Sequence, residues 1–342
     1  MANNVVAHQP NDFGVGLVAE STVGTPVDNT TQLFTDSVSL PSFAPDQDLS
    51  AKSGKFVADF AEIYSSSKNT PSEITMTGLL NDTVLGLLEG IFHTAASGDN
   101  VITVADSYTA PNLYHGLTTA AATRTYTVKL LSPQVLNQPT GSDTADNCVE
   151  LTSCCPISLT ISGDAGTDGG RLKYSLTMKT GYKPTFSHAA GTTTAPTING
   201  LQTIHDLTYR TIAGVASPVM QSFAITIENP VDYIGYDPVN NRPYTISRSV
   251  PEGPVVTMSS TVKLDYDTRG VLANFSNDTA QTGLVNNLGN HSGQASAKTS
   301  DTNWAFHCDK AIITGVSLNE QAAMMYDIEQ KLLFGTLTMR NT

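Results

Sequence analysis

Apolar and polar residues alternate with a period of two along much of the chain, the pattern of strands that bury one face. The clearest run begins at Leu172 and ends at Met178, with lysine, serine or threonine between the apolar positions. Segment 157–161 alternates in the same way, and the polar, glycine-rich residues 163–170 between the two runs predict a hairpin. Other runs of period two are Tyr126/Val128/Leu130, Phe223/Ile225/Ile227 and Val262/Leu264/Tyr266. The pattern predicts an all-β fold of sandwich or barrel-forming sheets.

Helical spacing is confined to two short segments. Asp82 or Thr83 can cap the first, because a side-chain oxygen there can accept from the free N–H groups of the first turn. A weaker candidate begins at Asp267, and Gly270 argues against much length. The apolar faces would consist of Val84, Leu87, Leu88 and Ile91, and of Val271, Leu272 and Phe275. We therefore expect one or two short helices beside the strands.

The two halves of the chain repeat one order of features, which predicts a duplicated β unit. In each half a strand is followed by a polar stretch, an apolar run, a short helix and a phenylalanine. The interval from Asp82 to Phe92 equals that from Asp265 to Phe275. Each half then closes with a pair of strands that begins just after a cysteine. The pairs are 155–161 with 172–178 and 311–318 with 331–337. The similarity is one of pattern and not of identity, so coincidence among β proteins remains the alternative.

On this basis we expect two tandem domains, residues 1–190 and 191–342. The joint between them is placed at residues 188–199, which read as a linker or long loop. Two further stretches, 137–147 and 286–303, are expected to be mobile loops.

Composition supports many short strands and limits the possible partners. Hydrophobic residues make up 39% of the chain and charged residues 14%, while Gly, Ser, Thr and Asn are abundant. The formal net charge is −13, from 31 acidic and 18 basic residues, and such a chain does not grip phosphates along a basic groove. The acidity permits a wall past which DNA slides, although simple solubility is the preferred explanation of the acidity taken alone. No apolar segment is long enough to cross a bilayer and no secretory signal is evident, so we expect synthesis in the cytoplasm.

A search for reactive chemistry finds no catalytic, cofactor-binding or metal-binding residue to assign. The loop 163–170 lacks the signature of a phosphate cradle or a dinucleotide site. Residues 265–270 open like a calcium loop, but Arg269 replaces an oxygen ligand and Ser276 stands where a bidentate Glu is needed. The cysteines, with His307, match no standard zinc spacing and are expected to be reduced thiols without an assigned role. They are Cys148, Cys154, Cys155 and Cys308.

Four segments, taken in order, resemble the tail tube proteins of tailed bacteriophages. Residues 14–26 resemble the opening of that family, where a Glu shortly before a Gly-Thr follows the first short strand; here these are Glu20 and Gly24-Thr25. The other three matching segments are the hairpin that starts at 155, the strand 223–229 with its Glu-Asn ending, and the closing strand 333–341. Each motif is weak alone, and no additional immunoglobulin-like domain follows the second half.

The resemblance implies a non-enzymatic virion protein without cofactors, a β-sandwich with a flanking helix. Sheets of neighbouring subunits would close into one inner barrel, and stacked rings would form a negatively lined conduit for DNA ejection. Three duplicated copies would make a pseudo-six-fold ring; without duplication six copies are expected. Implied partners are further copies and the tape measure, tail terminator and distal tail proteins, with a sheath if the tail is contractile. DNA would pass without specific binding.

The strands 172–178 and 262–266 are candidates for barrel or core strands, and ordinary sandwich strands remain the alternative for each. Residues 43–64 and 233–248 are candidates for contacts between rings, or plain surface hairpins. Three other functions stay open: a capsid decoration or distal tail protein, a carbohydrate-binding adhesin, which the single Trp304 disfavours, and a polysaccharide hydrolase, for which no cluster of acids stands out.

Overall fold

The structure, a computed structural model of the chain, is built from strands. It describes residues 14–22, 24–39, 45–48, 54–57, 64–69, 72–87, 90–91, 101–105, 125–131, 148–182, 184–188, 193–195, 203–228, 231–237, 242–248, 255–265, 268–276, 284–290, 305–320, 324–333 and 336–340. Strands account for 64% of it and helices are short, so the predicted all-β class is confirmed.

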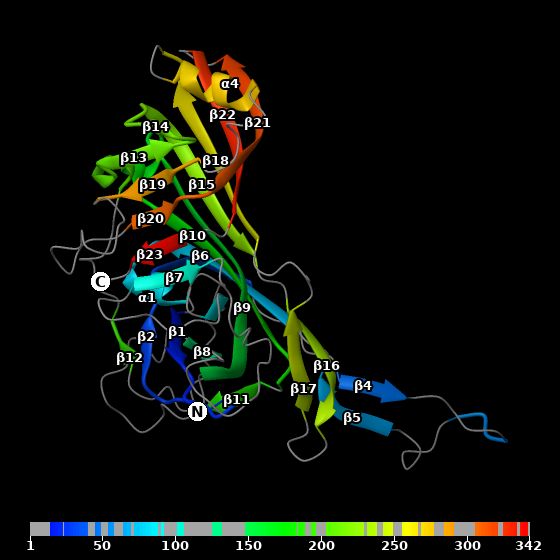
Figure 1. Cartoon of the computed structure of the whole chain (residues 1–342). Helices are drawn as coiled ribbons and strands as arrows, with labels where there is room; N and C mark the ends of the chain where they lie inside the picture. The colour runs from blue at the N-terminus through cyan, green and yellow to red at the C-terminus, as the bar shows by residue number, and fades with distance from the viewer. Residues whose placement is uncertain are drawn as a thin grey trace.

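Eight antiparallel strands form one large sheet, which we call the main sheet (Figure 1). Across it they are β3 (Thr35–Ser39), β6 (Ser72–Leu79), β10 (Lys173–Thr180), β9 (Cys148–Asp164), β15 (Met220–Glu228), β18 (Val255–Lys263), β22 (Met324–Leu332) and β21 (Ala311–Glu320). Two blocks of four strands make up this order. In each block the strands stand in the chain order first, second, fourth, third.

Two smaller sheets accompany the main sheet. The first is ordered β12 (Thr193–Thr194), β2 (Thr30–Gln32), β1 (Gly14–Ala19), β8 (Tyr126–Leu131), the start of β9, and β11 (Thr185–His188). The second is ordered β14 (Val215–Ala216), β13 (Tyr209–Ile212), β19 (Asn286–Gly289), β20 (Ala305–Cys308), β23 (Thr336–Arg340) and β7 (Val101–Ala105). One hydrophobic core cluster contains residues from all three sheets.

Two hairpins project from the body (Figure 1). One consists of β4 (Pro45–Asp48) and β5 (Tyr64–Asn69), and the other of β16 (Val231–Asp237) and β17 (Arg242–Arg248). Each lies in the chain between the first and second strands of its block. The second hairpin agrees with the one expected at 233–248, whereas the range expected for the first, 43–64, contains β4 but ends where β5 begins. The role of both in contacts between rings stays a prediction.

Among the described residues, the helices α1 (Asp82–Gly86) and α4 (Arg269–Ser276) follow β6 and β18, the second strand of each block. The first helix is capped by Asn81, whose Oδ1 accepts from Val84 N at 3.2 Å, so the prediction of Asp82 or Thr83 as the cap is wrong by one or two residues. Before α4, Asp265 and Thr268 each accept a hydrogen bond from the other's backbone N–H. The acidic start of the calcium-like segment therefore serves a turn that begins a helix.

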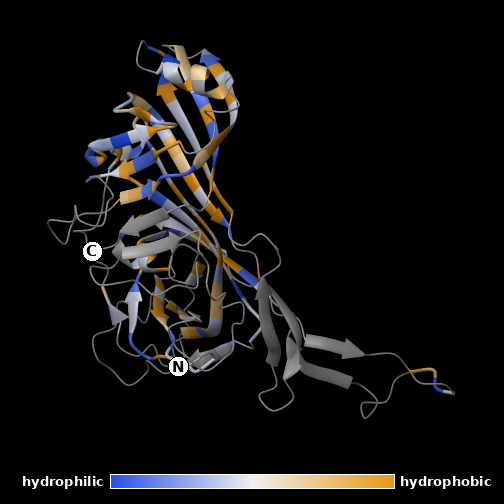
Figure 2. Cartoon of the chain, in the orientation of Figure 1, coloured by the Kyte–Doolittle hydropathy of each residue, from blue (hydrophilic) through white to orange (hydrophobic). Residues whose placement is uncertain are grey.

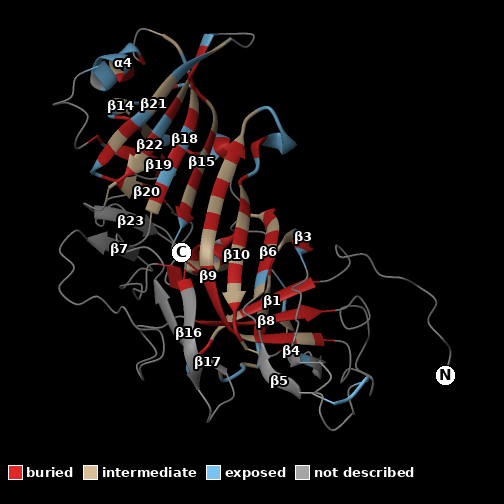
Figure 3. Ribbon diagram, turned by 90° about the vertical axis from the view of Figure 1, so that its right-hand side faces the viewer, coloured by how far each residue is buried: buried red, intermediate tan, exposed pale blue. Residues whose placement is uncertain are grey.

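Burial alternates along the main-sheet strands as their sequence predicts (Figure 3). Ile157 is an exception: a bulge in β9 takes it out of register, and it packs with Cys155 and Val231 apart from Leu159. The run expected to reach residue 266 is also shorter, because β18 ends at Lys263.

Three boundary predictions are corrected. The return strand expected at 331–337 is β22, which begins seven residues earlier at Met324. The loop expected at 286–303 begins with β19, whose four residues are all buried; residues 291–303, like 137–147, lie outside the described residues. The linker expected at 188–199 contains β12, which pairs in parallel with β2. The Asn- and Thr-rich composition of the β19 and β12 segments predicted loops, but pairing with strands distant in the sequence makes both of them strands.

Candidate assembly surface

Hydrophobic and hydrophilic residues alternate along the main-sheet strands (Figure 2), and the face that points away from the core carries many serine and threonine residues. Register places six hydroxyl residues in one row across six strands: Ser37, Thr77, Ser175, Thr160, Thr226 and Thr257. Two neighbouring pairs in the row bond directly, with 2.6 Å between the oxygens of Ser37 and Thr77 and 3.1 Å between those of Thr160 and Thr226. These bonds orient four of the hydroxyls while leaving acceptor capacity for water.

Charges of both signs border this row. In register with the hydroxyl row, β22 carries Lys331. The neighbouring rows on the same face contain Lys173, Glu329 and Asp327. Asp327 accepts from the Thr261 hydroxyl at 2.7 Å and from Asn319 Nδ2 at 2.9 Å. The acidic excess of the whole chain is therefore not concentrated on this face, whose character is polar and of mixed charge.

The two outer strands of the main sheet each have a strand partner on one side only among the described residues. β3 pairs with β6, and β21 pairs with β22. An outer strand presents a row of N–H and C=O groups that another chain can bond. This sheet therefore offers two complementary edges for association.

Exposed apolar side chains gather at the β21 end. Leu318 of β21 is 58% exposed, and Met324 at the start of β22 and Leu272 and Phe275 of α4 are exposed as well. Helix α4 contacts β21. In contrast, the helix in the same position of the other block, α1, buries its Val84 and Leu85. An apolar end beside an open edge is typical of a surface that a partner covers.

A buried carboxylate holds the point where β9 passes from the first small sheet into the main sheet. Glu20 is 4% exposed and accepts four hydrogen bonds: from Ser153 N at 2.8 Å, Gly24 N at 2.9 Å, and the hydroxyls of Thr125 at 2.7 Å and Thr127 at 3.1 Å. Ser153 has a φ of 54°, the left-handed region that is uncommon for serine. Burial raises the pKa of Glu20, and the four hydrogen bonds oppose that rise. We assign Glu20 a structural role, because it joins β1, β8 and the bend of β9.

A buried ion pair fixes the turn that covers the second face of β8. Lys129 is fully buried, with its Nζ 3.4 Å from Glu150 Oε2 and 3.3 Å from both Oδ1 and the backbone oxygen of Asp28. The backbone N–H of Val27 donates to the Thr127 hydroxyl at 3.2 Å. All six residues of β8 are consequently buried. The turn and the sheet form one rigid unit.

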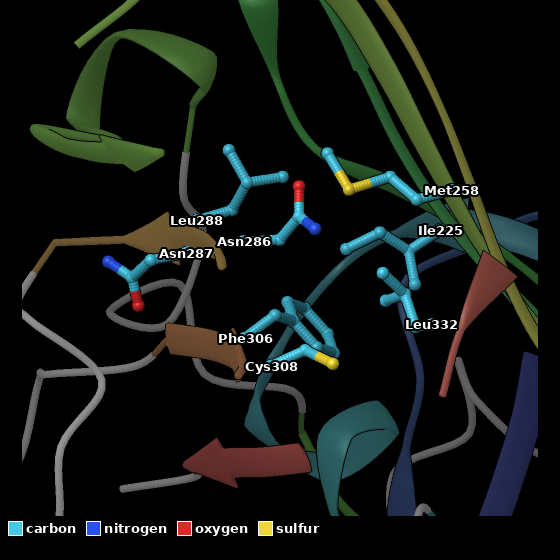
Figure 4. Close-up of a pocket in the computed structure, with 8 residues that line it drawn as sticks. All are labelled: Ile225, Met258, Asn286, Asn287, Leu288, Phe306, Cys308 and Leu332. Atoms are coloured by element: carbon cyan, nitrogen blue, oxygen red, sulfur yellow. The ribbon is translucent and has the colours of Figure 1, made fainter. Parts of the chain in front are cut away.

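One small cavity lies in the interior of the described part of the chain. The cavity, beside Met258, Asn286, Phe306 and Cys308, measures about 10 Å³ and has room for one water molecule at most (Figure 4). Asn286 Oδ1 accepts from Ala213 N at 2.9 Å, which places this amide in the packing of the second small sheet. Among the described residues no group of His, Cys, Asp or Glu is arranged to hold a metal ion. No helix there has the length and apolarity to span a bilayer.

None of the four cysteines forms a disulfide and all four are buried, as expected for reduced thiols. Burial raises the pKa of Cys155 to about 12 and those of Cys148 and Cys308 to about 11. The pKa of Cys154 is raised well above its usual value by burial and, secondarily, by the Glu20 carboxylate. The thiolate is the reactive form, so these side chains act as small apolar groups.

We expect none of the four thiols to react promptly with an aromatic disulfide reagent at pH 8. All four should react within seconds in guanidinium chloride, because unfolding removes the burial that raises their pKa values. Absorbance of the released thiolate checks both results. A cysteine that reacts at the denatured rate in native protein would contradict this burial.

The strands of this surface were predicted from the sequence, but their arrangement was not. Residues 173–178 lie in β10, the third strand of the main sheet, with Leu172 just before it, and of 262–266 only the first two belong to β18. The open β21 edge and Glu20's hydrogen bonds were not predicted; the one signal was the Glu before Gly-Thr in the opening segment. Neither the known protein-family models nor the curated proteins give a match to this chain.

Proposed function

We propose that this chain is a structural subunit that associates edge to edge into a closed ring, and that stacked rings form the tail tube of a tailed bacteriophage. The carrying observation is the main sheet, with one unpartnered edge at each end among the described residues and a hydroxyl-covered face between them. Joining the β21 edge of one copy to the β3 edge of the next satisfies both rows of backbone groups. A ring completes the pairing at every copy.

A ring of three copies follows if the chain contains two copies of one unit. The two blocks of the main sheet have the same strand order. The small sheets also correspond, as β2-β1-β8-β9-β11 and β14-β13-β19-β20-β23. We infer two tandem copies of one unit, divided near residue 190, so that three chains supply six units. With eight strands per chain, the closed barrel would be roughly 45–50 Å across between backbones, from the usual strand spacing and tilt.

The polar face suits the lumen of such a barrel. Serine and threonine hydroxyls keep a water layer and bring no excess of positive charge to bind phosphates. Apolar side chains, which would stack on bases in unpaired DNA, stay on the other face. Duplex DNA could therefore move along this wall without being held.

Concentration-dependent assembly tests the proposal. Purified chain should pass from monomer to trimer in light scattering after size-exclusion chromatography, and at high concentration negative-stain microscopy should show stacked rings with an open centre. A chain that stays monomeric at every concentration, also with tail-tip proteins present, would contradict it. Single rings that never stack would instead favour a capsid decoration or distal tail protein.

A further inference from the structure

The chain contains one complete junction between its two blocks, where β9 pairs with β15. In this junction Ser162 lies opposite Ala224, and Ile161 lies opposite Ile225. If the blocks are copies, the junction between chains, β21 with β3, should have the same geometry. Its register can then be read from this internal example.

Two β-bulges fix which residues of the blocks are equivalent. On β3 the extra residue is Asp36, between Thr35 and Ser37, and on β15 it is Gln221, between Met220 and Ser222. Both lie on the first strand of a block, opposite the second. A bulge is a defined irregularity that is kept when a unit is copied, so Asp36 and Gln221 are equivalent.

The second bulge gives the same alignment independently. Its extra residue is Ile157 on β9 and Thr314 on β21. Beside it, Met178 pairs with Pro156 and Gln330 pairs with Ile313.

The alignments from the two bulges can be compared on the second and fourth strands of each block, which lie between the bulged strands. Met178 also pairs with Ile74 of β6, and Gln330 with Met258 of β18. Ile74 stands four residues before Gly78, the partner of Thr35, and Met258 four before Val262, the partner of Met220. The two bulges therefore agree to the residue.

We propose that Asn319 of β21 lies directly opposite Ser39 of β3 in the next copy, as Ser162 lies opposite Ala224 within the chain. Ser162 stands five residues after the extra residue Ile157, and Asn319 stands five after Thr314, so these two are equivalent. Ala224 stands three residues after Gln221, and Ser39 stands three after Asp36, so these two are equivalent as well. The proposal rests on the proposed function, since it names the partner surface of the ring and its register.

Leu318 shows what this junction would cover. It is equivalent to Ile161, which is 0% exposed because β15 lies beside it, whereas Leu318 is 58% exposed. The next copy's β3, continued in the same register, would supply the missing neighbour. The exposure of Leu318 is thus that of a core position lacking its partner strand.

A polar pair at the internal junction supports the same register. Gln221 Nε2 donates to Asp164 Oδ1 at 3.1 Å. The equivalent positions are 36 and 321, and there the sequence has Asp and Gln. The amide and the carboxylate are retained with their places exchanged; position 321 lies outside the described residues, so this is a fact of the sequence alone.

Cysteine cross-linking in assembled rings tests the register. The variants Asn319→Cys and Ser39→Cys, made singly and mixed in equal amounts, are treated with diamide or a short bismaleimide. The intrachain pair Ser162→Cys with Ala224→Cys has the same proposed geometry and shows which reagent spans it. Ser317→Cys with Ser37→Cys is the control, because the register separates those positions by four residues, about 13 Å. The native thiols are buried, so they should contribute little background.

We expect covalent dimers from the Asn319/Ser39 mixture at a yield several-fold above the Ser317/Ser37 mixture. Rings that form but cross-link equally or better in the control would overturn the register and leave the proposed function standing. Absence of rings in the unmodified protein would overturn the proposed function itself. If either single variant fails to assemble, doping it into unmodified chain restores rings in which the same comparison is made.

Discussion

Leu318→Lys is expected to abolish assembly while leaving the monomer folded. The side chain is exposed in the single chain, so the substitution should change the free energy of unfolding by no more than about 0.5 kcal/mol. In the proposed junction the same position is buried among apolar groups, where an unpaired ammonium costs several kcal/mol. A cost of roughly 3 kcal/mol per junction would weaken each contact by over a hundredfold. Light scattering and negative-stain microscopy measure the outcome.

Ser317→Lys provides the matched control. Ser317 is the neighbouring residue on the same edge strand, also exposed, but its side chain points to the polar face. It adds the same charge without burying it, so rings should still form. Equal loss of assembly in both variants would indicate a general charge effect, and normal assembly of Leu318→Lys would exclude this edge from the junction.

Glu20→Ala is expected to destabilise the monomer by about 3 kcal/mol or more. It removes the acceptor for the buried N–H of Ser153 and the partly buried N–H of Gly24, and each unsatisfied buried donor costs roughly 1–3 kcal/mol. The bend of β9 at Ser153 also loses its support. Equilibrium denaturation in urea measures the change. Glu73→Ala, an exposed acid on β6, is the control and should cost little. Equal stability of both variants would refute the structural role of Glu20.

Glu20 also gives the stability a pH dependence of defined sign. Its pKa is raised by burial above the usual value of 4.5, so the folded state retains this proton to a higher pH than the unfolded chain. The contribution to the free energy of unfolding is therefore complete below about pH 4.5 and is lost as the pH rises through the folded pKa. Comparison with Glu20→Gln, which does not titrate, isolates this contribution. The advantage of the unmodified protein should shrink with rising pH across that window; an advantage that grows would show a lowered pKa instead.

Strand identity was the part of the fold that the sequence could predict. Period-two alternation located β8, β10 and β15, and the glycine-rich segment 163–170 correctly indicated the hairpin between β9 and β10. These signals are local, because one buried face and one turn are encoded within a few residues.

The features that organise the assembly surface depend on contacts distant in sequence. Nothing local marks Asp36 or Ile157 as extra residues of bulges, since a bulge is defined by the register of a partner strand. β9 belongs to two sheets because Ser153 bends it, and the bend depends on Glu20, 133 residues away. Asn286 and Asn287 are residue types typical of loops, but they lie in the buried strand β19. Pairing with β13 and β20 makes this segment a strand. Burial of polar residues of this kind is visible only when the partners are known.

The pairing of β7 with β23 has a consequence for how the chain matures on the ribosome. Residues 101–105 are synthesised well before their neighbours 336–340. At roughly 5–20 residues per second, the earlier strand waits about 10–50 s for its partner. The β7–β23 pair of the second small sheet therefore forms only after residue 340 has been made, and a polypeptide terminated before residue 336 would leave the β7 edge unpaired.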